Sequence, residues 1–365
     1  MFKLIPRPAP SRVWTIGSPL LALAITVIVG LAIFSGLGKD PLQGLLVLFW
    51  EPIKSSYALG ELMVKATPLL IIALGLSVCF RSNVWNIGAE GQFVMGAIFA
   101  GGMALSVGPA GSANAGFGNA LGMGIIPAIL LAGVLGGMFW AGITAFLRDR
   151  FNANEILVSL MLVYIAVLTL NFMVHGPWKD PLGYNFPQSK MFEAVTQMPK
   201  LLSGSRVNIG LVLGLLGAGF LWLFLFRTKA GFAQTVGGLA PAAAAYGGFS
   251  SRKALWTALL VSGGAAGLAG ALEVAGPIGQ LTPYIPAGYG FAAIIVAFVG
   301  RLHPLGMVLS AILMSMFYIG GELAQSRLGI PKSVTGVFQG LLLFALLACD
   351  TLIAYKITWS QRSAR

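Results

Sequence analysis

The chain has 365 residues, of which 57% are hydrophobic and only 9% are charged, whereas soluble proteins contain about 25% charged residues. This composition excludes an ordinary soluble domain and predicts one integral-membrane domain over residues 1–365 that crosses the lipid bilayer many times. The net charge of +12 does not indicate nucleic-acid binding, because the basic residues lie singly at the edges of apolar segments and form no basic patch.

Ten segments are apolar and have, or nearly have, the roughly 20 residues that a spanning helix needs. The first follows Lys3 and Arg7 but ends without a small-residue cleavage site, so we expect a retained span and not a secretory signal. The second is short and would need either snorkelling flanks or an extension into residues 58–65. The ten predicted spans are 15–37, 66–80, 83–106, 122–147, 155–175, 207–226, 254–275, 287–300, 304–322 and 334–354.

An even number of crossings returns the C-terminus to the side of the membrane on which the N-terminus lies. With both termini in the cytoplasm, the connections on the inner side carry most of the basic residues, as membrane proteins generally show. We therefore expect a multi-pass membrane protein with both ends cytoplasmic. The basic residues of the inner connections include Arg81, Arg148, Arg150, Arg227, Lys229, Arg252, Lys253 and Arg301.

The ten spans divide into a first half, 15–175, and a second half, 207–354, which are inverted relative to each other because five is odd. The third span is interrupted by Gly88 and Gly91, and the eighth by Pro286, Gly288 and Gly290. Interrupted spans at matching places in two inverted halves indicate a site near the middle of the membrane. The predicted fold is thus an all-α membrane protein of about ten helices.

Three connections are long. Residues 39–65 contain an apolar stretch too short to span and are expected to be interfacial or re-entrant. Residues 176–206 form an outer loop, and 227–253 form the largest inner loop, with a short Ala-rich helix in its middle. Small residues four apart, such as Gly133 and Gly137 or Gly263 and Gly267, predict closely packed helices.

The third span carries an unusual group of polar residues near its start: Asn83, Asn86, Glu90 and Gln92. A charge inside a bilayer costs about 3 kcal/mol, so Glu90 is expected to face protein or water. On a continuous helix Asn83, Asn86 and Glu90 would share one face and could line a transport pathway. Alternatively Gly88 and Gly91 break the helix, or Glu90 only joins helices by hydrogen bonds.

Motifs for catalysis or metal binding do not occur in the sequence. No phosphate-binding loop is present, so the chain is not itself an ATPase, and no hydrolase or zinc-protease signature occurs. We predict no catalytic residue, no metal site and no cofactor in this chain. The acids within spans, Glu90, Glu273 and Asp350, lie far apart, which disfavours an ion-coupled transporter but leaves it as an alternative.

Four ordered stretches resemble permease subunits of bacterial ABC importers. They are NVWNIGAEGQFVMGA at 83–97, NEILVSLMLVYIA at 154–166, VGGLAPAAAAYGGF at 236–249 with ALLVSGGAAGLAGALEV at 258–274, and GFAAIIVAFVGRLHPLG at 290–306. They are most similar to the branch that serves nucleosides and simple sugars, within the group that includes ribose and branched-chain amino acid permeases.

The resemblance implies a largely ten-span fold and three kinds of partner: a cytoplasmic ABC ATPase that binds ATP and Mg, a second permease subunit, expected to be a paralogue, and an extracytoplasmic substrate-binding protein. It also implies that the 227–253 loop couples the permease to the ATPase. An apolar helix at the cytoplasmic face agrees with a covering partner, although a helix lying on the lipid surface is the alternative. The predicted coupling residues are Gly237, Gly238, Pro241, Ala243, Ala244, Tyr246 and Gly247.

A nucleoside pathway is expected to be weakly polar, with aromatic rings that face a base or sugar without holding it tightly. Besides the polar residues of the third span, the candidates are Tyr164, Asn171, Gly288, Tyr289 and Phe291, although aromatic residues on spans often only pack. The predicted function is the permease of an ATP-driven nucleoside or nucleobase importer working by alternating access. A simple-sugar importer is the alternative, and a stand-alone secondary transporter or channel is the alternative of another class.

Overall fold

A computed structural model describes residues 2–7, 11–108, 122–202, 204–331 and 333–359. Within these residues eight helices are long and apolar enough to cross a membrane, and two shorter apolar helices, α4 (Ala89–Leu105) and α12 (Tyr289–Val299), lie at the third and eighth positions. The predicted all-α fold of about ten spans is confirmed. The eight long helices are α1 (Arg12–Gly36), α3 (Ser56–Arg81), α6 (Ile125–Phe151), α7 (Glu155–His175), α8 (Gly210–Arg227), α11 (Ser251–Glu273), α13 (Pro304–Leu328) and α14 (Ser333–Ala354).

The second and third spans differ in their boundaries from the prediction. α3 begins at Ser56, so the expected extension into 58–65 is present. α4 begins only at Ala89, and residues 84–87 are not helical, so the span predicted over 83–106 starts later than expected. Of the two alternatives for this span, the interrupted helix is present and the continuous one is not. The reason is local: Asn83 has a left-handed φ of 54°, and the Asn86 side chain accepts a hydrogen bond from the Gly88 amide at 3.1 Å, which competes with helix formation.

The chain forms two compact units, of which the first comprises residues 1–58 and 316–365. Strand β1 (Phe2–Pro6) pairs antiparallel with β2 (Tyr355–Trp359), with Phe2 opposite Trp359. α1 packs along α14, with Phe34 and Phe338 ring centroids 5.5 Å apart. Because β2 follows α14 directly and pairs with β1, the two described ends of the chain lie side by side, as expected for an even number of crossings.

Between α1 and α3 the backbone of the first unit forms only short helical pieces. They are α2 (Pro41–Leu45), the π-helical η1 (Leu46–Trp50) and the 3-10 helix η2 (Glu51–Ile53). Asp40 caps α2 by accepting from the Leu42 amide at 2.9 Å. None of these pieces approaches the length of a span, in agreement with the prediction for the first part of the 39–65 connection. Residues 56–65, predicted as part of the same connection, belong instead to the spanning helix α3.

The second unit, residues 59–315, is a helical bundle built around closely packed glycines. A β-carbon placed on Gly267 of α11 would lie 2.9 Å from the Gly137 Cα and closer still to the Gly133 carbonyl oxygen on α6. Backbones that approach this closely tolerate only small residues. The close helix packing that the four-residue glycine spacing predicts is present, and the structure shows that it joins α6 and α11.

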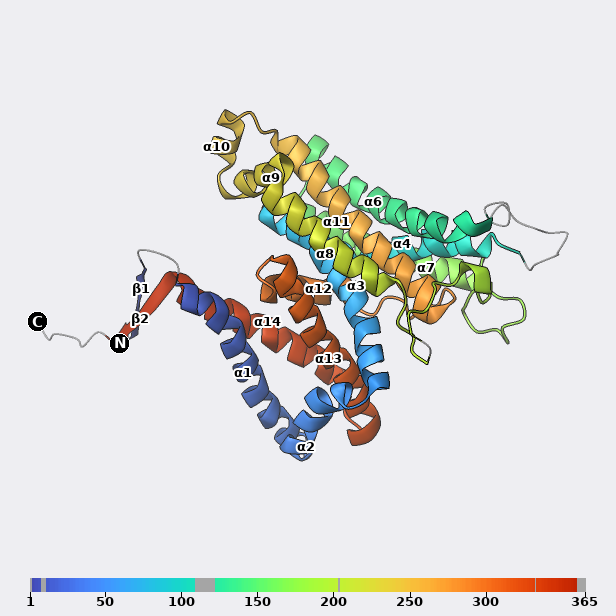
Figure 1. The fold of residues 1–365 in the computed structure, drawn as a ribbon, viewed down its shortest axis with the longest axis horizontal. Helices are drawn as coiled ribbons and strands as arrows, with labels where there is room; N and C mark the ends of the chain where they lie inside the picture. Colours follow the sequence, from blue (N-terminus) through green and yellow to red (C-terminus); the bar gives the residue numbers. More distant parts are fainter. Residues whose placement is uncertain (1, 8–10, 109–121, 203, 332, 360–365) are drawn as a thin grey trace, which may run out of the picture. The chain divides into compact units, whose positions relative to one another are not determined.

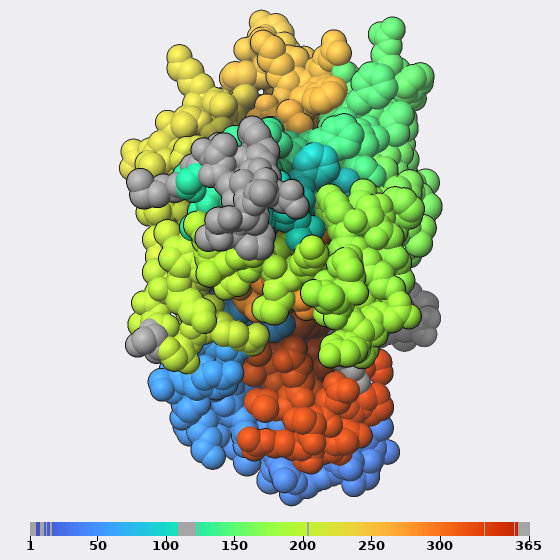
Figure 2. Space-filling model, turned by 90° about the vertical axis from the view of Figure 1, so that its right-hand side faces the viewer, coloured from blue at the N-terminus to red at the C-terminus, as the bar shows by residue number. Residues whose placement is uncertain are grey.

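Different connecting segments lie at the two ends of this bundle (Figure 1). At one end α9 (Lys229–Leu239) and α10 (Pro241–Tyr246) form the compact 227–253 loop, and at the other end lies the 176–209 connection. Figure 2 views the latter end and shows the connection, in yellow-green, spread over the surface. It is held there by backbone hydrogen bonds from Ser189 to Leu281 (2.9 Å) and from Phe192 to Gly279 (2.8 Å), among others.

Candidate functional site

The two short helices α4 and α12 meet at their N-terminal ends. The Glu90 carboxylate, in the first turn of α4, accepts hydrogen bonds from the Gly288 amide at 2.8 Å and the Gly290 amide at 2.5 Å. A β-carbon on Gly290 would lie 2.5 Å from the Glu90 Cα, so only glycine allows this approach. Glu90 is 2% exposed and lies at the positive ends of two helix dipoles, which stabilises its charge.

A second polar group lies beside this junction. Asn86 and Gln92 exchange two side-chain hydrogen bonds, at 2.9 and 3.1 Å, and Asn86 also donates to the Ser262 hydroxyl of α11 at 2.9 Å. All three residues are fully or almost fully buried. Their polar groups satisfy one another inside the protein, and in this state of the molecule they present no open surface to a substrate.

The glycines that interrupt the third span permit close packing against α7. A β-carbon on Gly88 would lie 2.8 Å from the Ser159 Cβ, and one on Gly91 would lie 2.9 Å from the Val163 Cα. The break in the span is therefore not a loose linker, because α7 fixes its position. Nonhelical backbone at this depth is tolerated where protein or a water-filled cavity covers it.

A cluster of four charged residues joins α3, α11 and the segment before α8. Arg206 forms a two-pronged ion pair with Glu61, in which its Nε donates to Oε1 at 3.0 Å and its Nη2 donates to Oε2. The Glu273 carboxylate lies within electrostatic range of Lys65 and Arg206 and beside the Tyr289 hydroxyl. The two acids and two bases balance each other, which lowers the cost of placing them in a largely apolar region.

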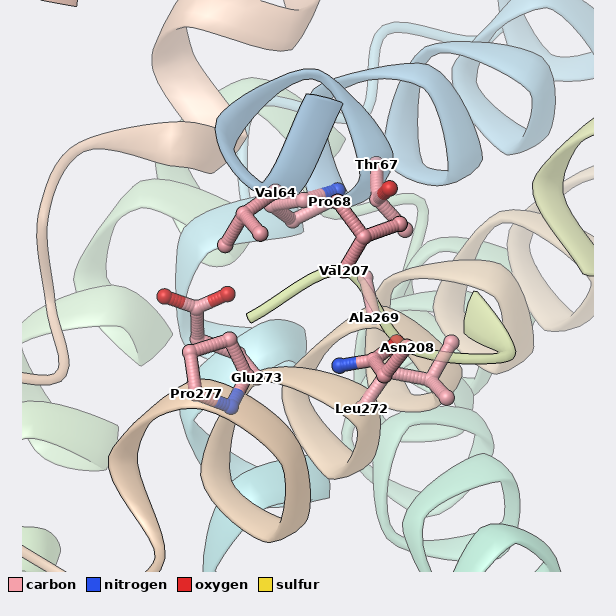
Figure 3. Close-up of a pocket in the computed structure, with 9 residues that line it drawn as sticks. All are labelled: Val64, Thr67, Pro68, Val207, Asn208, Ala269, Leu272, Glu273 and Pro277. Carbon is pink, nitrogen blue, oxygen red and sulfur yellow. The ribbon is translucent and has the colours of Figure 1, made fainter. Parts of the chain in front are cut away.

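Beside this cluster is a small cavity, on the scale of one water molecule (Figure 3). The Glu273 carboxylate points toward α3, and the Asn208 amide points into the space from the opposite side. Pro68 interrupts the hydrogen bonds of α3 at this level, and α11 continues into the π-helical turn η5 (Val274–Ile278). Irregular helix geometry therefore borders this cavity on two sides.

The 227–253 loop packs on the end of α3. The Ser82 hydroxyl and the Gln234 side chain of α9 are hydrogen-bonded, and a β-carbon on Gly238 would lie 2.9 Å from the Ser82 carbonyl carbon. The predicted single Ala-rich helix over 237–247 is corrected: Gly237 and Gly238 belong to α9, and α10 begins at Pro241 after a non-helical Ala240. Proline at the start of a helix cannot continue the preceding one, which explains the break.

The predicted coupling residues differ in exposure. Tyr246 is 99% exposed and the neighbouring Leu239 is 81% exposed, whereas Ala244 is only 3% exposed. Two surface hollows of about 350 and 390 Å³ flank α10, and both are bordered by Gly237. The remaining predicted coupling residues, Pro241, Ala243 and Gly247, lie on or directly after α10.

The other predicted pathway residues are dispersed. Asn83 borders the hollow that also contains Arg148 and Pro241, near the 227–253 loop. Tyr164 is 61% exposed on α7, and the Asn171 amide bonds the Val167 carbonyl of its own helix. Tyr289 is buried with its ring against Phe93, at 5.8 Å between centroids, and Phe291 is 40% exposed. The structure thus joins Asn86, Glu90, Gln92 and Gly288 with Tyr289 around the α4–α12 junction and places Asn83, Tyr164 and Asn171 elsewhere.

The ion-pair cluster is the feature that sequence reasoning missed. Glu61 and Lys65 are four residues apart and therefore lie on one face of α3, which was the available signal. Their partners Arg206 and Glu273 are more than a hundred residues away in the sequence. Among the residues that the structure describes, no group of His, Cys, Asp or Glu side chains is arranged to hold a metal ion.

Comparison with known proteins identifies the family. Residues 58–347 match the model of a family described as the permease component of the branched-chain amino acid transport system. A glucose ABC transporter permease of Haloferax volcanii is 29% identical, covering 93% of this chain and 89% of the relative. A nucleoside ABC transporter permease of Lactococcus lactis subsp. cremoris is 27% identical, covering 89% of each chain. A guanosine ABC transporter permease of Bacillus subtilis is 28% identical, covering 89% of this chain and 91% of the relative.

Proposed function

The chain belongs to the family of permease components of the branched-chain amino acid transport system, and from this premise we propose that it carries nucleosides inward through a membrane. It is a multi-pass permease of an ABC transporter. The observation that carries the proposed substrate is the similarity to nucleoside and guanosine permeases along about nine-tenths of each chain. The similarity to a glucose permease keeps a simple sugar as the second candidate.

The geometry supports an uncharged substrate. The polar groups at the α4–α12 junction are amides and one carboxylate that is occupied by two backbone amides. The charged cluster of α3 and α11 contains equal numbers of acids and bases. A pathway along these elements offers no uncompensated charge to attract an ionic substrate, which suits a nucleoside or a sugar.

Partner proteins supply the energy for transport and the selectivity for the substrate. A cytoplasmic ATPase, which binds ATP and Mg, contacts α10 and the end of α9, where Tyr246 and Leu239 are exposed. A second permease faces this one, and the presence of two similar permeases in L. lactis and in B. subtilis supports a paralogue in that role. An extracytoplasmic binding protein delivers the substrate at the opposite end of the bundle.

The proposed pathway of coupling follows direct contacts. Movement of α10 displaces α9, which is bonded to Ser82 through Gln234. Ser82 leads through the non-helical residues 84–87 to Glu90, which holds the N-terminal end of α12. ATP-driven movement of the 227–253 loop therefore reaches the α4–α12 junction through the segment from Ser82 to Glu90, which is continuous in sequence and packed against other helices. The termini and this loop lie in the cytoplasm, and the membrane is the bacterial inner membrane.

The function is tested with the complete complex in liposomes. We expect ATP-dependent uptake of guanosine in the presence of the binding protein, and no uptake by this chain alone under an ion gradient. Uptake of glucose but not of guanosine would favour the sugar importer. Uptake by the isolated chain under a sodium or proton gradient would replace the importer with a secondary transporter.

Coupling is tested at Tyr246. Tyr246→Asp adds a charge to an exposed face that a partner is proposed to cover, so copurification of the ATPase and uptake should both be lost while the chain remains in the membrane. The matched control is Tyr184→Asp, because Tyr184 is 94% exposed in the 176–206 loop at the other end. Normal ATPase copurification with Tyr246→Asp, or equal loss with the control, would remove α10 from the ATPase interface.

A further inference from the structure

An apolar groove runs along the surface of the second unit, where α4, α6 and α11 lie side by side (Figure 1). Its volume is about 770 Å³, and aliphatic and aromatic side chains line it together with Gly142. The lining residues of α6 extend from Leu135 to Leu147, a length of about 18 Å at 1.5 Å per residue. This is slightly more than half of the roughly 30 Å hydrocarbon thickness of a bilayer, so the groove lies mostly within one leaflet.

Gly142 gives the groove its depth. A β-carbon on Gly142 would have only the Leu260 side chain within 4 Å, at 3.9 Å, whereas one on Gly137 of the same helix would collide with α11. Close helix packing therefore requires Gly137 but not Gly142. Since glycine destabilises the interior of a helix relative to alanine, Gly142 has a cost that packing does not offset. The space that a larger residue would fill belongs to the groove.

Charged residues lie at the end of the groove where α6 ends and α11 begins. The Asp149 carboxylate accepts hydrogen bonds from the Trp256 indole at 3.1 Å and from the Arg252 Nε at 2.7 Å. Arg252 precedes the lining residue Trp256 by four positions, and Arg150 follows the lining residue Phe146 by four. Each arginine therefore continues a lining face by one turn, and both are exposed.

This end of the groove has an excess of positive charge. Arg148 pairs with Glu155, and Arg252 pairs with Asp149. Two further bases lie beside these pairs, so the excess is about two charges at low dielectric screening. The residues concerned are the bases Arg148, Arg150, Arg252 and Lys253 and the acids Asp149 and Glu155. An apolar groove that ends at such a rim is complementary to an anionic lipid, which joins apolar acyl chains to a negative phosphate.

We propose that the groove binds an anionic phospholipid, with its acyl chains along α6 and its phosphate at Arg150 and Arg252. Arginine suits this role because its guanidinium can donate two parallel hydrogen bonds to a phosphate. With the 227–253 loop in the cytoplasm, the lipid belongs to the inner leaflet. The site lies apart from the α4–α12 junction and does not depend on which substrate is carried.

A helix of the second permease is the competing occupant. The volume divided by the length gives a mean cross-section of about 43 Å², roughly half of the about 80 Å² of a helix 10 Å across. A helix therefore cannot enter the groove, and one that covered it would leave empty space, which forfeits packing contacts. Flexible hydrocarbon chains can fill a groove of this width.

The phosphate would lie next to the coupling loop. Asp149 and Arg252 also border the 390 Å³ hollow that contains Pro241 of α10. A lipid that binds both α6 and α11 at this level holds together the helix ends beside the loop. Because it binds only the folded chain, it should raise the melting temperature.

The experiment uses the full chain, purified in detergent and stripped of lipid. The probe is palmitoyl-oleoyl phosphatidylglycerol, and phosphatidylcholine with the same acyl chains is the comparison. Native mass spectrometry counts the bound lipids, and thermal unfolding measures their effect on stability. We expect one phosphatidylglycerol to bind about tenfold or more tightly than phosphatidylcholine, because two arginines lie at its phosphate.

One variant fills the groove. Gly142→Leu should weaken phosphatidylglycerol binding about tenfold, because its side chain occupies the place of an acyl chain. The melting temperature of the stripped chain should not fall, since the new β-carbon meets only Leu260. The matched control is Gly219→Leu on α8, where a β-carbon meets nothing within 4 Å; it should bind the lipid normally.

A second variant removes the charge and leaves the groove open. The double variant Arg150→Gln with Arg252→Gln should bind the two lipids equally, while glutamine at 252 can still donate to Asp149. Its control is Arg227→Gln with Lys229→Gln, which removes the same charge at the end of α8. That control should keep the preference for phosphatidylglycerol.

The outcomes that overturn the site are distinct. Equal affinity of the wild-type chain for both lipids, or equal loss of binding in Gly142→Leu and Gly219→Leu, rejects it. Unaltered lipid binding by Gly142→Leu, with loss of the second permease from the complete complex, would make the groove a subunit interface instead. Guanosine uptake is not a readout here, so failure of the proposed substrate and failure of this site are distinguishable.

Discussion

Glu90 illustrates how one buried charge can be stabilised by backbone alone. Its two carboxylate oxygens accept from two different amides of the α12 N-terminal end, and no cationic side chain is needed. Sequence reasoning left a pathway role and a structural role open for Glu90. The observed bonds support a structural role in this state of the protein, whereas participation in transport remains a prediction.

Replacing Glu90 tests this assignment. In Glu90→Gln one side-chain oxygen can still accept, but the new NH2 group faces a second amide donor, so we expect a loss of about 2 kcal/mol in the free energy of unfolding and a lower melting temperature in detergent. Glu155→Gln is the control, since Glu155 forms a partly exposed pair with Arg148. Unchanged stability together with reduced uptake would instead assign Glu90 to the pathway.

The next prediction concerns the cluster of Glu61, Lys65, Arg206 and Glu273. Glu273→Gln removes one carboxylate and leaves Lys65 and Arg206 with less compensation. Breaking a buried pair costs about 3 kcal/mol or more, and the partial exposure of Arg206 reduces this to about 2 kcal/mol here. We expect thermal unfolding in detergent to occur at a lower temperature.

A second substitution distinguishes charge balance from packing at this cluster. The double variant Glu273→Gln with Lys65→Met should recover much of the lost stability, because it removes the excess positive charge together with the carboxylate. A double variant that is less stable than Glu273→Gln alone would indicate that Lys65 contributes chiefly through its contact with Tyr289, whose ring centroid lies 5.5 Å from the lysine nitrogen.

At the scale of elements, the contact between α6 and α11 decides how the second unit packs. Four glycines, in pairs on the two helices, allow backbone approaches that any β-carbon would prevent. Hydrophobic burial cannot drive this association within lipid, so close van der Waals packing carries it. The glycines are therefore requirements of the fold and say nothing about the substrate.

Gly267→Ala should consequently be destabilising. Its new methyl group would overlap the Gly133 carbonyl, and overpacking of this kind costs on the order of 1–3 kcal/mol. Gly219→Ala on α8 is the matched control, because a β-carbon there meets nothing within 4 Å and alanine favours the helix. Size-exclusion profiles after heating should show early aggregation for Gly267→Ala only. Equal profiles for both variants would mean that α6 and α11 separate readily.

At the scale of the whole molecule, the positions of the chain ends and of the long loops bear on how the protein lies in the membrane. The pairing of β1 with β2 holds the two ends of the chain together. The 227–253 and 176–206 loops lie at opposite ends of the second unit. The excess of basic residues in the proposed inner connections predicts that the termini and the 227–253 loop face the cytoplasm.

Cysteine labelling tests this orientation. In a chain whose two natural cysteines, Cys79 and Cys349, are replaced by alanine, Tyr184→Cys should react with a membrane-impermeant maleimide in intact cells. Tyr246→Cys should react only after the membrane is opened, because the reagent cannot reach the cytoplasm. Both side chains are almost completely exposed, so accessibility alone does not distinguish them. The reverse pattern would invert the topology and exclude α10 as the contact for a cytoplasmic ATPase.

The sequence by itself determined the number and approximate places of the spans, the presence of closely packed glycine helices and the family, because apolar length, residue spacing and local motifs are properties of contiguous residues. Only the tertiary structure decided where α4 begins, which amides Glu90 binds, how Glu61, Lys65, Arg206 and Glu273 pair, and that Phe298 stacks on Phe80. These contacts join residues up to about two hundred positions apart. A polar or aromatic residue within a span signals that a partner is required, but the partner is chosen by which helices the packed bundle brings together.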